Sequence, residues 1–152
     1  MTKKKHVALV MGGLSSEMEV SLSSGNAVHK AMLELGYKVT VIDMGRDIAL
    51  KLYEINPDLV YNALHGTYGE DGCLQGLLEI MAIPYTHSGV MASAIAMDKQ
   101  QAKHIFEAVG IQCCTGFEAT REDILNGTVE KKISRPYVIK PVAEGSSVGV
   151  HV

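Results

Sequence analysis

The chain has 152 residues, of which 47% are hydrophobic and 20% are charged, and its formal net charge is −3. This composition is typical of a folded globular protein and excludes extended disorder, while the length suits one average domain or one small domain plus part of another. The negative charge excludes an electrostatic attraction to nucleic acid or anionic membranes. No apolar run reaches the ~20 residues of a membrane helix, and no signal-peptide core is present. We therefore expect a cytoplasmic protein.

Predicted strands and helices alternate through the first two thirds of the chain. In chain order we expect a buried strand at 6–11, a helix at 16–35, a strand at 38–43, a helix at 47–55, a strand at 58–64, a helix at about 74–81 and a short strand within 83–89. The apolar residues of the first helix that share a stripe are Val20, Ala27, Val28, Ala31 and Leu35. Four successive strand–helix units predict an α/β fold with a doubly wound parallel sheet.

The pattern loosens in the last third of the chain. We expect a long helical region at about 91–109, a strand at 115–119, a short helix at 121–125, and a final turn after "RPYVIKP". Two or three strands and one short helix bury little apolar surface by themselves. This part therefore predicts a second, incomplete domain.

Polar loops follow three of the predicted strands. They are "GGLSSE" after the first strand, "HGTYGEDG" after the third and "THSGVMASA" after the fourth. In doubly wound sheets, ligands bind beyond the carboxyl ends of the strands. The three loops therefore predict a ligand site at one edge of the sheet.

Glu17 closes the first of these loops. It lies in the first turn of a predicted helix, where a carboxylate interacts favourably with the helix dipole. Alternatively, it binds an ammonium group of a ligand, and the residues alone leave both readings open. The loop lacks the G-x-G-x-x-G spacing of dinucleotide-binding folds, which disfavours a nucleotide-dependent oxidoreductase.

The second loop holds His65, Glu70 and Asp71 between glycines. The two acids are suited to capping the helix that follows. His65 is suited to carrying a proton or donating a hydrogen bond to a ligand carboxylate, or to a purely structural role. The remaining histidines show no paired spacing and the three cysteines match no zinc pattern, so we expect no metal site within this chain.

Near the carboxyl terminus, Lys140 precedes the stretch "EGSSVG". Gly145 lets the turn fold closely over a ligand, and Ser146 and Ser147 offer hydroxyl and N–H donors to phosphate oxygens. The spacing is not that of a Walker A loop. An ordinary β-hairpin connection is the alternative reading.

Three segments taken together resemble one family. "VALVMGGLSSEMEVSLSSG", "ALHGTYGEDGCLQGLLEIMAIPYTHSGVMASAIAMDK" and "PYVIKPVAEGSSVGV" resemble D-alanine–D-alanine ligases, which are ATP-grasp enzymes of peptidoglycan precursor synthesis. The resemblance implies a Rossmann-like N-terminal substrate domain at residues 1–97. It also implies the truncated start of an ATP-grasp central domain at residues 98–152.

The resemblance also implies the chemistry. ATP phosphorylates the carboxylate of a first D-alanine, and the amino group of a second D-alanine attacks the acyl phosphate. Glu17 then binds the ammonium group of the first D-alanine and His65 lies beside its carboxylate. ATP contacts fall on Lys99, Lys140, Glu144, Gly145, Ser146 and Ser147. Ser146 is also implied to be linked to Glu17, which makes these two the catalytic pair.

Further expectations follow from the resemblance. The ligands of Mg²⁺ fall beyond Val152, and a homodimer forms through the N-terminal domain. Residues 1–152 alone are then inactive, because the metal and the second D-alanine lack their sites. A non-enzymatic Rossmann-like module that binds an amino acid through Glu17 and His65 is the alternative.

Overall fold

The computed structural model describes residues 5–145 and 147–152. The chain divides into two compact units, the first ending at Ala94 and the second beginning at Ile95. Among the described residues, no helix combines the length and the apolar character needed to cross a membrane.

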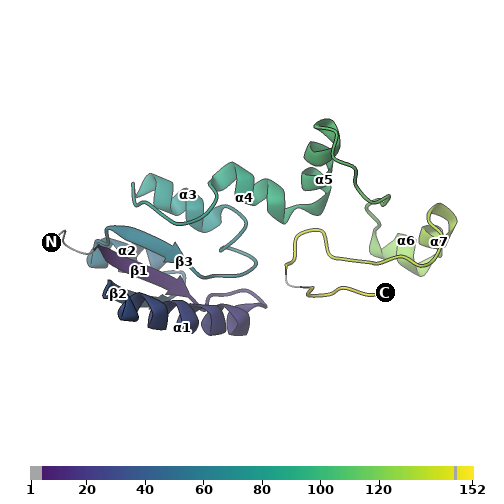
Figure 1. The fold of residues 1–152 in the computed structure, drawn as a ribbon. Helices are drawn as coiled ribbons and strands as arrows, with labels where there is room; N and C mark the ends of the chain where they lie inside the picture. The colour runs from purple at the N-terminus through teal and green to yellow at the C-terminus, as the bar shows by residue number, and fades with distance from the viewer. Residues whose placement is uncertain (1–4, 146) are drawn as a thin grey trace. The chain divides into compact units, whose positions relative to one another are not determined.

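The first unit is an α/β structure built on a three-stranded parallel sheet (Figure 1). The strands and helices follow in the order β1 (His6–Met11), α1 (Met18–Glu34), β2 (Lys38–Asp43), α2 (Ile48–Ile55), β3 (Leu59–Asn62), α3 (Cys73–Ile80) and α4 (Val90–Met97), which crosses the boundary between the units. The strand order is β2-β1-β3, with both pairs parallel. These observations confirm the α/β class.

The central strand β1 is buried on both faces, as its continuous apolar run predicts. Alternate residues of a strand point to opposite faces, so β1 contributes to two clusters. Ala8 and Val10 pack with α2 and α3 in a core whose other buried members are Ile42, Met44, Ile48, Leu52, Val60, Leu64, Leu74 and Leu78. Leu9 and Met11 pack on the other face against Leu22 and Val28 of α1. Helices therefore cover both faces, which is the doubly wound arrangement.

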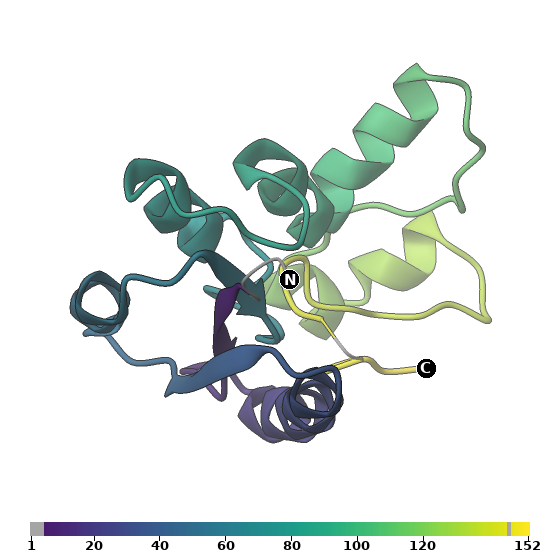
Figure 2. The same ribbon diagram turned by 60° about the vertical axis from the view of Figure 1, so that its left-hand side comes forward.

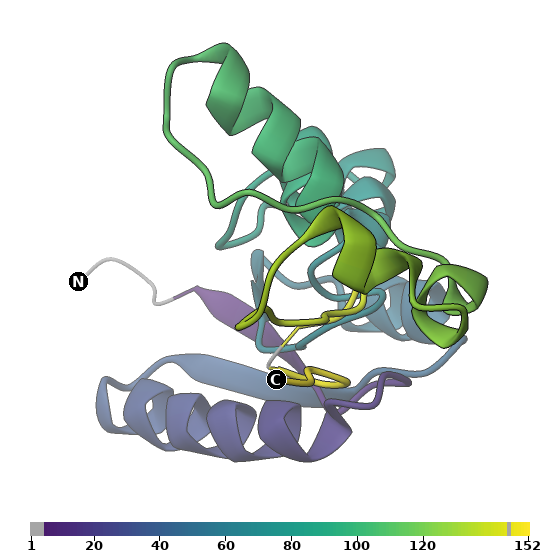
Figure 3. The ribbon, with the colours of Figure 1, turned by 90° about the vertical axis from the view of Figure 1, so that its right-hand side faces the viewer.

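Helix α1 lies along the sheet (Figure 3), but the residues that it buries are not the predicted apolar stripe. Its buried residues are Ser21 and Gly25, whereas Val20 is 44% exposed and Leu35, which follows the helix, is 63% exposed. The predicted apolar stripe is therefore wrong apart from Val28. A Cβ atom on Gly25 would collide with the side chain of Met11. The helix backbone approaches the sheet so closely that only small residues fit there.

The sheet is smaller than the sequence pattern predicts. The segment expected to form a fourth strand pairs with β3 only through an isolated parallel bridge between Val60 and Tyr85. Pro84 precedes this bridge, and its carbonyl oxygen accepts a hydrogen bond from the N–H of Val60 at 2.8 Å. The predicted fourth strand is thus reduced to a single parallel bridge, which lies in the segment that connects α3 to α4.

The second unit is mostly helical and irregular. It contains α5 (Lys99–Ala108), α6 (Arg121–Leu125) and α7 (Thr128–Lys132). The predicted helix at 91–109 is two helices, because the Asp98 carboxylate accepts bonds from the N–H groups of Gln100 and Gln101 and starts α5 anew. The predicted strand at 115–119 is absent, and residues 111–120 have no regular structure (Figure 2). Helix α7 was not predicted.

Candidate functional site

The carboxylate of Glu17 is the least satisfied buried group in the first unit. Glu17 directly precedes α1 and is 2% exposed. Neither of its carboxylate oxygens has a hydrogen-bond partner among the described residues, and its side chain does not cap the helix. A carboxylate buried without a donor is unfavourable, whereas an interaction with the helix dipole requires no burial. The geometry therefore favours a cationic ligand over a role in the helix alone.

Gly66 forms one wall beside this carboxylate. Its φ of +70° lies in the left-handed region, and a Cβ atom built on it would collide with Oε2 of Glu17. The N–H of Gly66 is already used, since it donates to Oε2 of Glu70 at 2.7 Å. Glycine at this position thus lets the Glu17 carboxylate pack directly against the backbone, and its N–H supplies no donor to it.

His65 lies next to Gly66 and is fixed at two points. Ser15 Oγ donates to the carbonyl oxygen of His65 at 2.7 Å, and Ser24 Oγ lies 3.2 Å from His65 Nε2. Ser15 Oγ also accepts a bond from the N–H of Glu17 at 3.1 Å. Ser15 therefore joins the loop after β1 to the loop after β3, and it brings Glu17 and His65 into one site.

The acids of the second loop have structural partners. Glu70 accepts the bond from Gly66, and the Asp71 carboxylate accepts bonds from the N–H groups of Tyr68, at 2.8 Å, and Cys73, at 3.0 Å. Asp71 thus supports the start of α3. Burial, followed by a hydrogen bond and the negative charge of Asp71, raises the pKa of the Cys73 thiol. A thiol held in its protonated form is a poor nucleophile, so Cys73 is not a candidate for catalysis.

Polar side chains that the sequence did not single out also hold the loop after β3 in place. Asn62 Nδ2 and Gln75 Nε2 both donate to the carbonyl oxygen of Gly69, at 2.8 and 2.9 Å. Asn62 Nδ2 also lies 2.9 Å from His87 Nε2. Gln75 is 1% exposed. The only signal in the sequence was Gln75 itself, a polar residue next to Leu74 on the buried side of an amphipathic helix.

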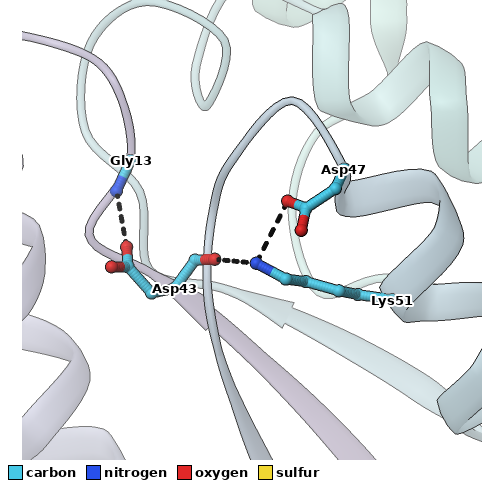
Figure 4. A network of polar contacts seen from close by, with 4 residues as sticks. All are labelled: Gly13, Asp43, Asp47 and Lys51. Atoms are coloured by element: carbon cyan, nitrogen blue, oxygen red, sulfur yellow. Dashed lines mark hydrogen bonds and ion pairs between the residues drawn. The ribbon is translucent and has the colours of Figure 1, made fainter.

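The turn after β1 is held from the side of β2 (Figure 4). The N–H of Gly13 donates a long hydrogen bond of 3.4 Å to Oδ1 of Asp43, the last residue of β2. Lys51 Nζ donates to the Asp43 carbonyl oxygen at 3.1 Å and pairs with Asp47 at 3.1 Å. In dinucleotide-binding folds, an acid placed in this way binds a ribose hydroxyl. Here the Asp43 carboxylate accepts a hydrogen bond from the turn after β1 instead, which further disfavours a nucleotide-dependent oxidoreductase.

The residues predicted to contact ATP belong to the second unit. Lys99 begins α5, and its Nζ donates to the carbonyl oxygens of Val142, at 3.3 Å, and Glu144, at 2.6 Å. The structure thus brings Lys99 and Glu144 together. Lys140 is exposed, and it follows Ile139, which forms an antiparallel bridge with His151. This bridge closes the glycine- and serine-rich stretch as a wide loop.

Within that loop, the N–H of Val148 donates to the carbonyl oxygen of Gly145 at 2.9 Å, and Ser147 has a φ of +62°. Ser146 lies outside the described residues. A cavity of about 500 Å³ lies on the same unit, and none of the described residues predicted to contact ATP lines it. Its lining residues are Arg135, Pro136, Tyr137, Ile139, His151 and Val152.

No group of three or more histidine, cysteine, aspartate or glutamate side chains is placed to hold a metal ion in the described part of the chain. The candidate site is built from loops of an α/β fold beyond the carboxyl ends of β1 and β3.

The chain is similar to D-alanine–D-alanine ligases. Residues 49–88 match the family described as "D-ala D-ala ligase N-terminus". The D-alanine–D-alanine ligase of Rickettsia typhi is 59% identical over 151 residues, which cover 99% of this chain and 46% of that protein. The chain is therefore homologous to the N-terminal part of D-alanine–D-alanine ligases, and it spans about half the length of the relatives it matches.

Solved structures agree with this assignment. The D-alanine–D-alanine ligase of Bacillus anthracis matches with a TM-score of 0.74 and 36% identity, over 96% of this chain and 48% of that one. The same enzyme complexed with ATP matches with a TM-score of 0.72 and 34% identity, over 94% and 49%. The fold class expected from the sequence is thus also that of the family.

Proposed function

We propose that this chain supplies the site for the first D-alanine, and part of the ATP site, of an ATP-dependent D-alanine–D-alanine ligase. In this reaction, ATP phosphorylates the carboxylate of one D-alanine. The amino group of a second D-alanine attacks the resulting acyl phosphate, and phosphate leaves as D-alanyl-D-alanine forms. The product serves peptidoglycan precursor synthesis in the cytoplasm.

The observation that carries the proposal is the buried carboxylate of Glu17, which has no hydrogen-bond partner among the described residues. An ammonium group supplies the donors and the positive charge that both oxygens lack. Oε2 packs against the backbone of Gly66, where a side chain would collide with it. His65, whose carbonyl oxygen is joined through Ser15 to the N–H of Glu17, would donate to the ligand carboxylate.

The second unit supplies the proposed ATP contacts. Positive charge from Lys99 and Lys140 and N–H donors of the loop at Glu144, Gly145, Ser146 and Ser147 would stabilise the charge on a transferring phosphoryl group. Lys99 already lies against the loop through its bonds to Val142 and Glu144, which supports a shared role. The link from Ser146 to Glu17, and with it a catalytic role for that pair, belongs to the proposal.

Three further elements complete the proposal. The ATP would bind with Mg²⁺, whose ligands we assign to the part of the longer relatives that follows Val152. The domains are assigned to residues 1–97, a Rossmann-like substrate domain, and 98–152, the start of an ATP-grasp central domain. The protein would form a homodimer through the first of these. The matches to enzymes support this proposal over a non-enzymatic amino-acid-binding module.

A chimaera tests the proposal. Residues 1–152 are joined to the remaining part of the Rickettsia typhi relative, and D-alanine-dependent ADP release is measured with a coupled assay. We expect activity in the chimaera and none in residues 1–152 alone. Glu17→Gln should lower kcat/KM of the chimaera at least ~30-fold, because one partner of a buried charge pair is lost.

Glu19→Gln is the matched control, since Glu19 is an exposed acid in the first turn of the same helix. It should leave activity unchanged. Turnover by residues 1–152 alone, or equal activity of the two variants, would refute the proposal.

A further inference from the structure

We propose that Ser24 is a positioning residue that sets the tautomer of His65. In this arrangement the Ser24 hydroxyl donates to Nε2, so the ring proton resides on Nδ1 and remains available to a carboxylate. The assignment of that carboxylate to D-alanine rests on the proposed function. The tautomer itself is a property of the ligand-free chain.

The contacts of His65 limit its freedom from two sides. The hydroxyl of Ser15 holds its backbone carbonyl at 2.7 Å, and the hydroxyl of Ser24 lies 3.2 Å from Nε2. The first contact fixes the position of the residue, and the second fixes the rotation of the ring. A half-buried imidazole held in this way presents its other nitrogen in one direction only.

Helix α1 is built to bring Ser24 to this position. Ser21 and Ser24 are three residues apart and therefore lie on the same face of the helix. Ser21 Oγ donates to the carbonyl oxygen of Ala63 at 2.8 Å, two residues before His65. Gly25 allows the helix backbone to approach β1 closely. Short serine side chains can reach the exit of β3 only because of this approach.

The chemistry gives Ser24 and Ser21 different roles. A neutral imidazole has one N–H and one bare nitrogen, and a hydrogen bond to one nitrogen decides which of them carries the proton. Ser21 bonds to a backbone carbonyl, so it contributes to stability alone. Ser24 contacts the ring, and a serine hydroxyl can donate to a bare nitrogen or accept from an N–H. Among the described residues the Ser24 hydroxyl has no acceptor other than Nε2, so the proposed tautomer carries the ring proton on Nδ1. A carboxylate can accept a bond only from the protonated nitrogen.

The test is ¹⁵N NMR of the His65 ring in residues 1–152, recorded at a pH where the ring is neutral. In the wild-type chain we expect the shift of a protonated nitrogen for Nδ1 and that of a bare nitrogen for Nε2. Ser24→Ala should move the population toward the Nε2–H tautomer. Ser24→Thr keeps the hydroxyl and should restore the wild-type pattern.

Two neighbouring serines serve as controls. Ser21→Ala should lower the melting temperature without changing the tautomer, and Ser23→Ala, at an exposed position of the same helix, should change neither. A protonated Nε2 in the wild-type chain would overturn the proposal, as would a Ser24→Ala spectrum that equals the wild-type spectrum.

Titration with D-alanine separates this proposal from the proposed function. If the tautomer follows Ser24 but D-alanine leaves the His65 ring signals unmoved, the positioning role stands and the ligand assignment fails. If D-alanine moves the ring signals equally in the wild-type chain and in Ser24→Ala, the ligand assignment stands and the positioning role fails. We expect D-alanine to move the Nδ1 signal in the wild-type chain and to move it less in Ser24→Ala.

Discussion

The two units differ most in how much they bury. The first holds two apolar clusters, one on each face of a parallel sheet. In the second, Val129, 5% exposed, is the only buried apolar residue among the described residues. The candidate residues divide in the same way. Glu17 is enclosed in the first unit, while Lys99 and Glu144 contact one another at a loop of the second. The one buried charge among the candidate residues thus belongs to the unit with the larger apolar core.

The largest effect is expected from the core of the first unit. Leu52 in α2 is 0% exposed, so Leu52→Ala should lower the free energy of unfolding by about 2–5 kcal/mol through lost burial and a cavity. Leu50 lies on the same helix and is 59% exposed, so Leu50→Ala should cost less than about 0.5 kcal/mol. Urea denaturation followed by a probe in β1 measures both. Equal costs would show that the sheet does not hold the core we describe.

A smaller effect of opposite sign is expected at Glu17. Neither oxygen of this buried carboxylate has a hydrogen-bond partner in the described part of the chain, so its replacement with a neutral amide of the same shape should raise the free energy of unfolding by about 1–3 kcal/mol. Thermal unfolding of Glu17→Gln against Glu19→Gln measures this difference without ligand. A loss of stability in Glu17→Gln would mean that the carboxylate has a stabilising partner.

The second unit should respond weakly even at its most buried position. Val129→Ala removes two methylene equivalents and should cost about 1–2 kcal/mol, measured as faster hydrogen exchange of α7 amides. Val138 is 49% exposed, so Val138→Ala should leave that exchange unchanged. If Val129→Ala destabilised its unit as strongly as Leu52→Ala destabilises the first, the contrast between the units would fail.

The smallest effect concerns the start of α6. A hydrogen bond from the Thr120 hydroxyl, followed by one from the Thr120 N–H, lowers the pKa of Asp123 below its ordinary value of 3.8. A lowered carboxyl pKa stabilises α6 at pH values above 3.8, and this contribution is lost as the pH falls through the lowered value. Carboxyl ¹³C titration should show that Thr120→Ala raises the pKa toward 3.8, whereas Thr120→Ser does not. Unchanged titration in Thr120→Ala would contradict the capping contact.

The sequence predicted the first unit better than the second for a physical reason. The apolar run of β1 and the leucines of α3 follow from burial, and burial dominates in the first unit. In the segment 115–119 only Thr115 and Phe117 favour a strand, and the segment pairs with no strand in the described part of the chain, so it stays irregular. Asp98 could have been recognised as a helix start, since its carboxylate caps α5.

The site was predictable in part. Glu17 and His65 follow strand ends, where ligand residues gather, and the structure joins them through Ser15. The contact of Ser24 with His65 spans 41 positions in the chain, and no local pattern announces it. The stripe predicted for α1 failed because close packing at Gly25 selects small residues over apolar ones.

The proposed function depends most on an ammonium group binding to the Glu17 carboxylate. The most direct test is a titration of ¹⁵N-labelled residues 1–152 with D-alanine, followed at the Gly66 amide, with propanoate as the ligand that lacks the ammonium group. The account predicts a saturable shift with D-alanine in the wild-type chain, and no shift with propanoate or in Glu17→Gln. An unmoved Gly66 amide, or an equal response to propanoate or in Glu17→Gln, would contradict it.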